Sequence, residues 1–109
     1  MTRPRAPKHL CPKTRRWWSS VVNEWQLEDH HKKLLTLAAE SWDRIAEAQE
    51  QITIDGVYIK DRFGQLKPHP ALAVERQEKI CFARLLRELD LDVDPPPESR
   101  RPAKLRRYK

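Results

Sequence analysis

Residues 29–51 read DHHKKLLTLAAESWDRIAEAQEQ and contain neither glycine nor proline. Their apolar side chains recur every three or four residues, which predicts a long α-helix. At 100° per residue, the apolar positions from Leu34 to Ile52 fall within an arc of roughly 160°, whereas charges such as Glu40 and Arg44 occupy the opposite side. An arc of roughly 100° is enough to face one partner. The long helix is therefore expected to pack on its own domain and on something else as well.

Two shorter helices are expected, one before the long helix and one after it. The first begins at Pro12, a residue tolerated at the first helical position, and ends near Gln26. The other begins near Pro70 and ends near Leu89. In between, residues 52–67 mix β-branched residues with turn residues, which is typical of a short hairpin or an ordered loop. The predicted fold class is mainly α, a three-helix domain with a long central helix.

The charge of the chain is strongly partitioned. The net charge is +6, from 22 basic and 16 acidic residues. Residues 1–16 and residues 100–109 each carry six basic residues and no acid, which leaves 10 bases against all 16 acids in residues 17–99. The predicted organisation is a basic tail over residues 1–11, a helical domain over residues 12–93, and a Pro-rich basic tail over residues 94–109.

Basic tails of this kind typically bind polyanions, of which nucleic acid is the commonest. A tail that only keeps the protein in solution is the alternative. The candidate DNA-binding residues are the bases of the two ends: Arg3, Arg5, Lys8, Lys13, Arg15, Arg16, Arg100, Arg101, Lys104, Arg106, Arg107 and Lys109.

The tryptophans indicate where the core lies. Trp18, Trp25 and Trp42 fall on apolar stripes and are predicted core residues, whereas Trp17 could stack on a base or fill a subunit contact, and the contact is favoured. A single-chain core of this size rarely supplies more than ~3–5 kcal/mol of stability, so a homo-oligomer is expected. The candidate interface residues are Trp17, Leu35, Leu37 and Trp42.

Nothing in the sequence indicates a catalytic site. The chain has 2 glycines and no Gly-x-x-x-x-Gly-Lys loop to hold a nucleotide. Cys81 lies on the apolar stripe of the third predicted helix and is expected to be a core thiol. Ser19 and Ser20 lie outside any nucleophile motif.

No metal, other cofactor or membrane segment is predicted either. The histidines and cysteines show none of the usual metal-ligand spacings. His30 and His31 lie at the edges of the apolar arc, where partly buried structural histidines are the expected interpretation. No window reaches 18 consecutive apolar residues, so no membrane span is predicted. The 2 cysteines are interpreted as reduced thiols of a cytosolic protein.

The order of these elements resembles the small terminase subunits of tailed double-stranded DNA bacteriophages. The resemblance runs over most of residues 14–101, and its most specific part is the turn and the start of the third helix. One departure is Asp90, which stands where the family tends to have the glycine of Leu-Gly-Leu-Thr-Pro. The residues that carry the resemblance are Trp18, Asp29 to Leu35, Gly56, Gly64, Lys67-Pro68-His69-Pro70-Ala71-Leu72, Leu89-Asp90-Leu91, Pro95 and Arg100-Arg101.

The resemblance implies a function in packaging viral DNA. Such subunits assemble into rings, recognise the double-stranded DNA where packaging begins, and deliver it to the large terminase subunit. The large subunit holds the ATPase and nuclease, which the small subunit regulates without catalysis of its own. The implied location is the cytoplasm of the bacterial host cell.

Two other classes of protein remain possible from the sequence. One is a small helical transcriptional regulator that binds DNA through a helix-turn-helix. Against it, the connection at residues 52–69 is far longer than the usual 3–4-residue turn, and the long helix has a mostly acidic polar face. The other is a non-catalytic adaptor whose tails bind an acidic protein.

Overall fold

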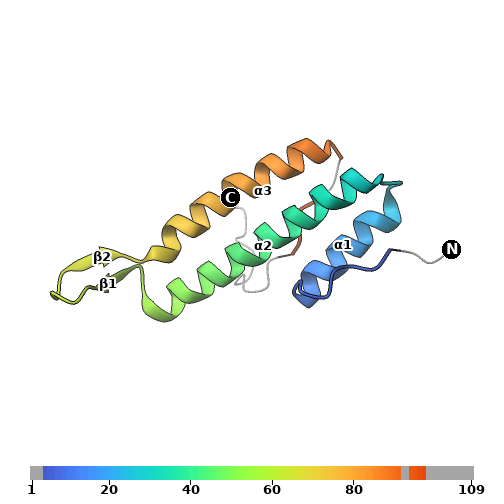
Figure 1. Ribbon diagram of the computed structural model, residues 1–109. Coiled ribbons are helices and arrows are strands. Elements are labelled where there is room, and N and C mark those ends of the chain that lie inside the picture. The colour runs from blue at the N-terminus through green and yellow to red at the C-terminus, as the bar shows by residue number, and fades with distance from the viewer. Residues whose placement is uncertain (1–3, 92–93, 98–109) are drawn as a thin grey trace, which may run out of the picture.

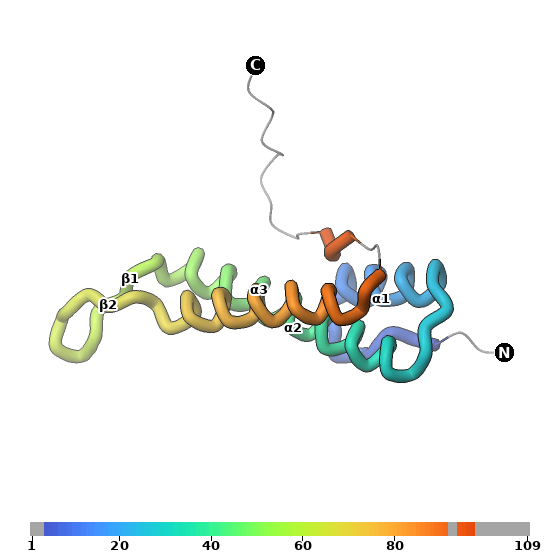
Figure 2. The backbone as a smooth tube through the Cα atoms, turned by 90° about the horizontal axis from the view of Figure 1, so that it is seen from above, coloured from blue at the N-terminus to red at the C-terminus, as the bar shows by residue number. Residues whose placement is uncertain are grey.

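The computed structural model describes residues 4–91 and 94–97, which form three helices and a two-stranded hairpin (Figure 1). Helices α2 and α3 run antiparallel along one another, as Figures 1 and 2 both show. Helix α1 packs against the N-terminal half of α2, and the hairpin projects from the opposite end of the molecule. The elements are α1 (Pro12–Glu24), α2 (Asp29–Asp55), β1 (Tyr58–Lys60), β2 (Leu66–Pro68) and α3 (Pro70–Leu89). The predicted fold class is confirmed, and α1 and α3 begin at the predicted prolines.

The long helix extends further than the sequence indicated. Residues 52–55, which were expected to belong to the hairpin or loop, form the last turn of α2. The hydroxyl of Thr53 donates to the carbonyl of Gln49 at 2.9 Å, so a β-branched residue is accommodated in the helix. The helix ends at Gly56, whose φ of 87° is readily adopted only by glycine.

The ends of α3 show how local residues set the limits of a helix. His69 precedes Pro70, and its Nδ1 accepts the backbone N–H of Ala71 at 2.9 Å. The same histidine ring lies 2.8 Å from Asp55, which ties the start of α3 to the end of α2. At the other end, Asp90 adopts a left-handed conformation with φ 51° and ψ 38°. Glycine is the usual residue in this capping position, so Asp90 occupies it with some backbone strain.

The core lies where all three helices meet. Phe82 of α3 is its centre, with the ring of Trp42 at a centroid distance of 4.9 Å and the ring of Trp17 at 6.3 Å. Trp18 is buried and Trp25 is half-buried, which agrees with their prediction as core residues. The buried apolar residues are Leu10, Trp17, Trp18, Val21, Leu35, Ala38, Ala39, Ile45, Ala48, Phe82 and Leu89.

Two of the predicted side-chain environments are wrong. Cys81 is exposed rather than part of the core, because α3 turns Phe82 toward α2 and the preceding residue is rotated by about 100° away from that face. His30 is exposed rather than partly buried. His31 is half-buried, and its Nδ1 accepts the backbone N–H of Glu28 at 3.3 Å, so it caps the start of α2.

Asp43 fastens α1 to α2. Its carboxylate is buried, and it accepts the backbone N–H of Cys11 at 2.9 Å and the hydroxyl of Thr14 at 2.6 Å. The first turn of α1 is therefore held by a side chain of another helix, since Cys11 itself forms no side-chain cap.

Replacing Asp43 with alanine is expected to lower the free energy of unfolding by about 2–4 kcal/mol, because the buried hydroxyl of Thr14 and the part-buried backbone N–H of Cys11 lose a charged acceptor. Denaturation in urea, followed by tryptophan fluorescence, measures the change. Asp43→Asn is the matched control, since it keeps the shape and one acceptor oxygen, and should lose less. An alanine variant as stable as the unaltered protein would contradict the role of Asp43.

The hairpin turn is closed by the side chain of Asp61. Strand β1 pairs antiparallel with β2, with Lys60 opposite Leu66. One carboxylate oxygen of Asp61 accepts the backbone N–H groups of Phe63 at 2.8 Å and Gln65 at 3.0 Å. Gly64 supplies the positive φ of 75° that such a turn requires.

Acid should loosen this turn. The backbone N–H groups of Gln65 and Phe63 hold the pKa of Asp61 below its ordinary value of 3.8. Because the folded pKa is depressed, the stabilising effect is present above pH 3.8 and is lost as the pH falls through the lower folded value. NMR signals of the Phe63 and Gln65 amides, followed from about pH 6 to about pH 2, should shift with that titration. Asp61→Asn should abolish the shift, and amides that do not respond to acid would contradict the expectation.

Candidate nucleic-acid interface

The apolar stripe of helix α1 packs into the core, so the polar face of the helix is turned outward. Thr14, Trp17, Trp18 and Val21 are buried and follow the spacing of one helical face. The remaining face presents basic side chains in the first turns and short polar side chains beyond them. These residues are Lys13, Arg15, Arg16, Ser19, Ser20 and Asn23.

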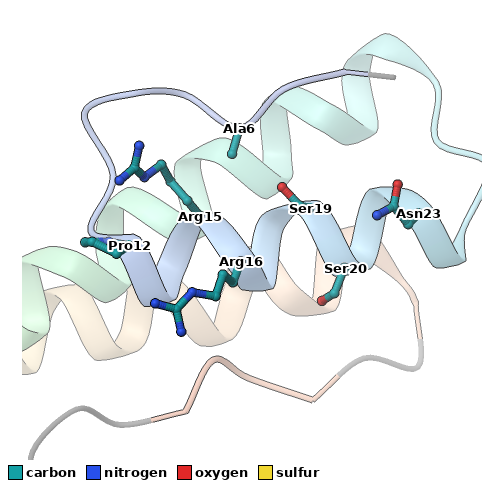
Figure 3. A pocket seen from close by; sticks show the side chains of 7 residues that line it. All are labelled: Ala6, Pro12, Arg15, Arg16, Ser19, Ser20 and Asn23. Atoms are coloured by element: carbon teal, nitrogen blue, oxygen red, sulfur yellow. The ribbon is translucent and has the colours of Figure 1, made fainter. Parts of the chain in front are cut away.

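This outward face is flanked by two open grooves. The first runs between α1 and the N-terminal segment and is shown in Figure 3, where the guanidinium groups of Arg15 and Arg16 both project away from the helix. Its lining residues are Ala6, Pro12, Arg15, Arg16, Ser19, Ser20 and Asn23. The second groove runs between α1 and the segment of residues 94–97, and is lined by Lys13, Arg16, Trp17, Ser20 and Pro97.

Arg16 and Ser20 border both grooves, so they form the ridge between them. The ion pairs of residues 4–91 and 94–97 involve none of the bases of α1. Arginine, lysine, serine and asparagine are among the side chains that contact phosphate oxygens in protein–DNA complexes. The bases of this face can therefore hold a phosphate backbone without breaking an ion pair of the described residues.

A family model described as the phage terminase small subunit matches residues 15–104. The chain belongs to the family of phage terminase small subunits. The match begins in α1, includes α2, the hairpin and α3, and continues into the C-terminal segment. No curated protein and no solved structure gives a significant match. Membership of this family assigns the chain to the packaging of phage DNA.

The predicted DNA-binding residues of this small subunit are only partly placed by the structure. Arg5, Lys8, Lys13 and Arg16 are exposed, and Arg15 is half-buried beside the first groove. The structure brings Lys13, Arg15 and Arg16 together on α1. The others lie outside the described residues: Arg3, Arg100, Arg101, Lys104, Arg106, Arg107 and Lys109.

Part of the predicted N-terminal tail is packed against the helices of the small subunit. Leu10 is a buried core residue, and the ring of His9 lies 2.9 Å from the carboxylate of Glu40 on α2. On the other side of α1, Pro96 is buried and the indole N–H of Trp17 donates to the carbonyl of Asp94 at 2.7 Å. Two chain segments thereby form the walls of the α1 grooves.

The four predicted interface residues have different environments. Leu35 has no exposed surface within one chain, and Trp17 is buried, so neither offers surface to a neighbouring subunit. Trp42 is half-buried against the core. Leu37 is 49% exposed, and it lines a shallow groove together with Lys32, Lys33 and Thr36. An assembly contact on this part of α2 would rest on Leu37.

Glu28, His30 and His31 form a cluster at the start of α2 that the sequence did not indicate. Their potential ligand atoms lie within 4.8 Å of one another. The Nδ1 of His31 already accepts a backbone N–H, and the positive end of the helix dipole opposes a cation there. A metal ion could be held only if His31 ceased to cap the helix.

The polar half of the α1 face was also missed. Ser19 and Asn23 lie four residues apart on the side opposite the buried stripe, and this complementary spacing was the available signal.

Partial desolvation of the sulfur and the neighbouring Asp43 raise the pKa of Cys11, which favours an inert thiol over a nucleophile. None of the helices in the described residues is long and apolar enough to cross a membrane.

Proposed function

We propose that this terminase small subunit binds double-stranded phage DNA, assembles into a closed ring, and passes the DNA to the large terminase subunit in the cytoplasm of the host. It regulates the ATPase and nuclease of the large subunit and has no catalytic activity itself. The observation that carries the proposal is the outward face of α1, where three bases and three hydrogen-bonding side chains line two open grooves.

The charge distribution supports DNA binding at the ends of the chain. Residues 17–99 carry 10 bases and 16 acids, so the net charge of this part of the molecule opposes phosphate binding. The bases of α1 adjoin the basic N-terminal segment, and six further bases follow in residues 100–109. A ring would present each weak contact several times, which raises the effective affinity for one DNA molecule.

The surface of the helices supports assembly. Besides Leu37, the side chains of Val74 and Ile80 on α3 are 47% and 49% exposed. Contact with a neighbouring subunit would remove these apolar side chains from water, which favours association. Heterologous contacts between identical subunits generate a closed ring when the rotation closes.

Mass measurement by light scattering after size exclusion tests the ring, and several subunits per particle at micromolar concentration are expected. A mass that corresponds to a monomer or a dimer would contradict the proposed ring. The same preparation should bind a duplex of about 30 base pairs in fluorescence anisotropy. It should show no ATP hydrolysis alone and should raise hydrolysis by the large subunit. ATP turnover that persists through purification would overturn the non-catalytic role.

A further inference from the structure

The tip of the β1–β2 hairpin is a preorganised turn. The backbone N–H of Asp61 donates to the carbonyl of Gln65 at 2.9 Å, and that of Gly64 donates to the carbonyl of Asp61 at 3.0 Å. Together with the two hydrogen bonds that the Asp61 carboxylate accepts, four hydrogen bonds stabilise the turn of residues 61–65. Arg62 and Phe63 occupy the two central positions of this turn. Their backbone is already ordered, so a ligand that binds them pays little for ordering the loop.

Phe63 is the most exposed large apolar side chain at the hairpin end. It is 81% exposed, compared with 62% for Tyr58 and 66% for Leu66 in the strands below it. The hairpin extends away from the three-helix core and forms one extremity of the folded chain (Figures 1 and 2). Phe63 belongs to the turn of this hairpin. A side chain in this position adds nothing to the core of its own subunit, so packing within the chain does not explain it.

The hairpin carries positive charge on an otherwise acidic body. Residues 57–68 hold three bases and one acid, whereas the remainder of residues 17–99 holds 7 bases and 15 acids. The single acid, Asp61, is already engaged by two backbone N–H groups and by Lys67 at 3.4 Å. Among the described ion pairs, none involves Lys60 or Arg62. Lys60 and Arg62 therefore lie within three positions of Phe63 in the sequence, and no ion pair of the described residues engages either cation.

We propose that the β1–β2 hairpin is a second DNA-binding arm, which inserts Phe63 between base pairs from the minor groove while Lys60 and Arg62 contact the adjacent phosphates. The inference rests on the proposed DNA-binding function and adds a site distinct from α1. Architectural proteins use apolar wedges in this manner, and the unstacking of one base step kinks the duplex.

The combination of positive charge and an exposed aromatic tip favours DNA as the ligand of the arm. The acidic surface of a second copy of this chain would also attract Lys60 and Arg62, so the particle mass of the Phe63→Ala variant separates the two occupants. A cationic ribbon with an aromatic tip matches the combination of phosphate attraction and base stacking found in nucleic-acid-binding surfaces.

The test compares the full-length protein with its Phe63→Ala and Arg62→Ala variants. Ile54→Ala and Arg84→Ala are the matched controls, because they remove an exposed apolar residue from the last turn of α2 and an exposed arginine from α3. Anisotropy reports affinity for a duplex of about 30 base pairs, and energy transfer between dyes at its ends reports bending. Light scattering reports assembly, and thermal melting reports folding.

Phe63→Ala is expected to weaken binding about tenfold and to abolish the bending, with assembly and melting unchanged. Arg62→Ala should weaken binding less and make the dependence of log K on log salt shallower by about 0.9. The Ile54→Ala and Arg84→Ala controls should leave affinity and bending unaltered.

Three results would overturn the inference, each for a different reason. If the unaltered protein binds no duplex, the proposed DNA-binding function fails and the arm fails with it. If the unaltered protein binds but Phe63→Ala binds and bends equally well, the arm alone is wrong. If Phe63→Ala lowers the particle mass, the tip is a contact between subunits instead.

Discussion

Replacing Leu35 with alanine should lower the free energy of unfolding by about 3–5 kcal/mol. The side chain has no exposed surface and belongs to the buried cluster between the three helices, so its loss leaves a cavity that a small core cannot refill. A core of this size supplies about that much stability in total. The variant is therefore expected to be largely unfolded as a single chain, which urea denaturation and circular dichroism measure directly.

Leu37→Ala is the matched control for Leu35→Ala, two residues away on the same helix. Leu37 is 49% exposed, so its removal should cost the single chain less than about 1 kcal/mol. If Leu37 contacts a neighbouring subunit, the particle mass should fall while the fold persists. Equal losses of stability in both variants would show that the two leucines share one environment, contrary to the structure.

Removing residues 100–109 should produce the largest loss of DNA binding. The truncation removes six bases and no acid. Each phosphate contact that is lost makes the dependence of log K on log salt shallower by about 0.9. The slope should therefore fall by up to about 5, and affinity at low salt should fall by about a thousandfold or more.

The double substitution Arg15→Ala, Arg16→Ala separates the α1 face from the tail. It should reduce the salt slope by about 2, because at most two phosphate contacts are lost. Anisotropy titrations at about 50 and about 200 mM salt measure both effects, with Arg84→Ala on α3 as the control. If neither the truncation nor the double substitution changes the slope, the DNA lies on another surface, and the hairpin arm becomes the first candidate.

Local signals were sufficient to predict most of the helices. Pro12 and Pro70 begin α1 and α3, where a missing backbone N–H costs nothing. The three-to-four-residue recurrence of apolar side chains identified α2. The end of α2 was misjudged because β-branched residues such as Ile52 and Ile54 are common in strands, and only the position of Gly56 in space shows where the helix stops.

The basic part of the candidate site was also visible in the sequence, but its surroundings were not. A run of bases without acids identifies Lys13, Arg15 and Arg16 in any conformation. The grooves beside them exist because residues 4–10 and 94–97 lie along α1, and segments so distant in sequence meet only in the folded chain.

Composition and periodicity by themselves determined the number of helices, their approximate limits and the location of the positive charge, because each of these depends on residues within a few positions of one another. Only the tertiary structure determined which side chains contact one another. Asp43 bonds Thr14 across 29 residues, and Trp17 bonds Asp94 across 77. Periodicity identifies the residues that share a helical face. Which segment packs on that face depends on the packing of the whole chain. That packing therefore decides that Leu35 is buried and Cys81 is exposed.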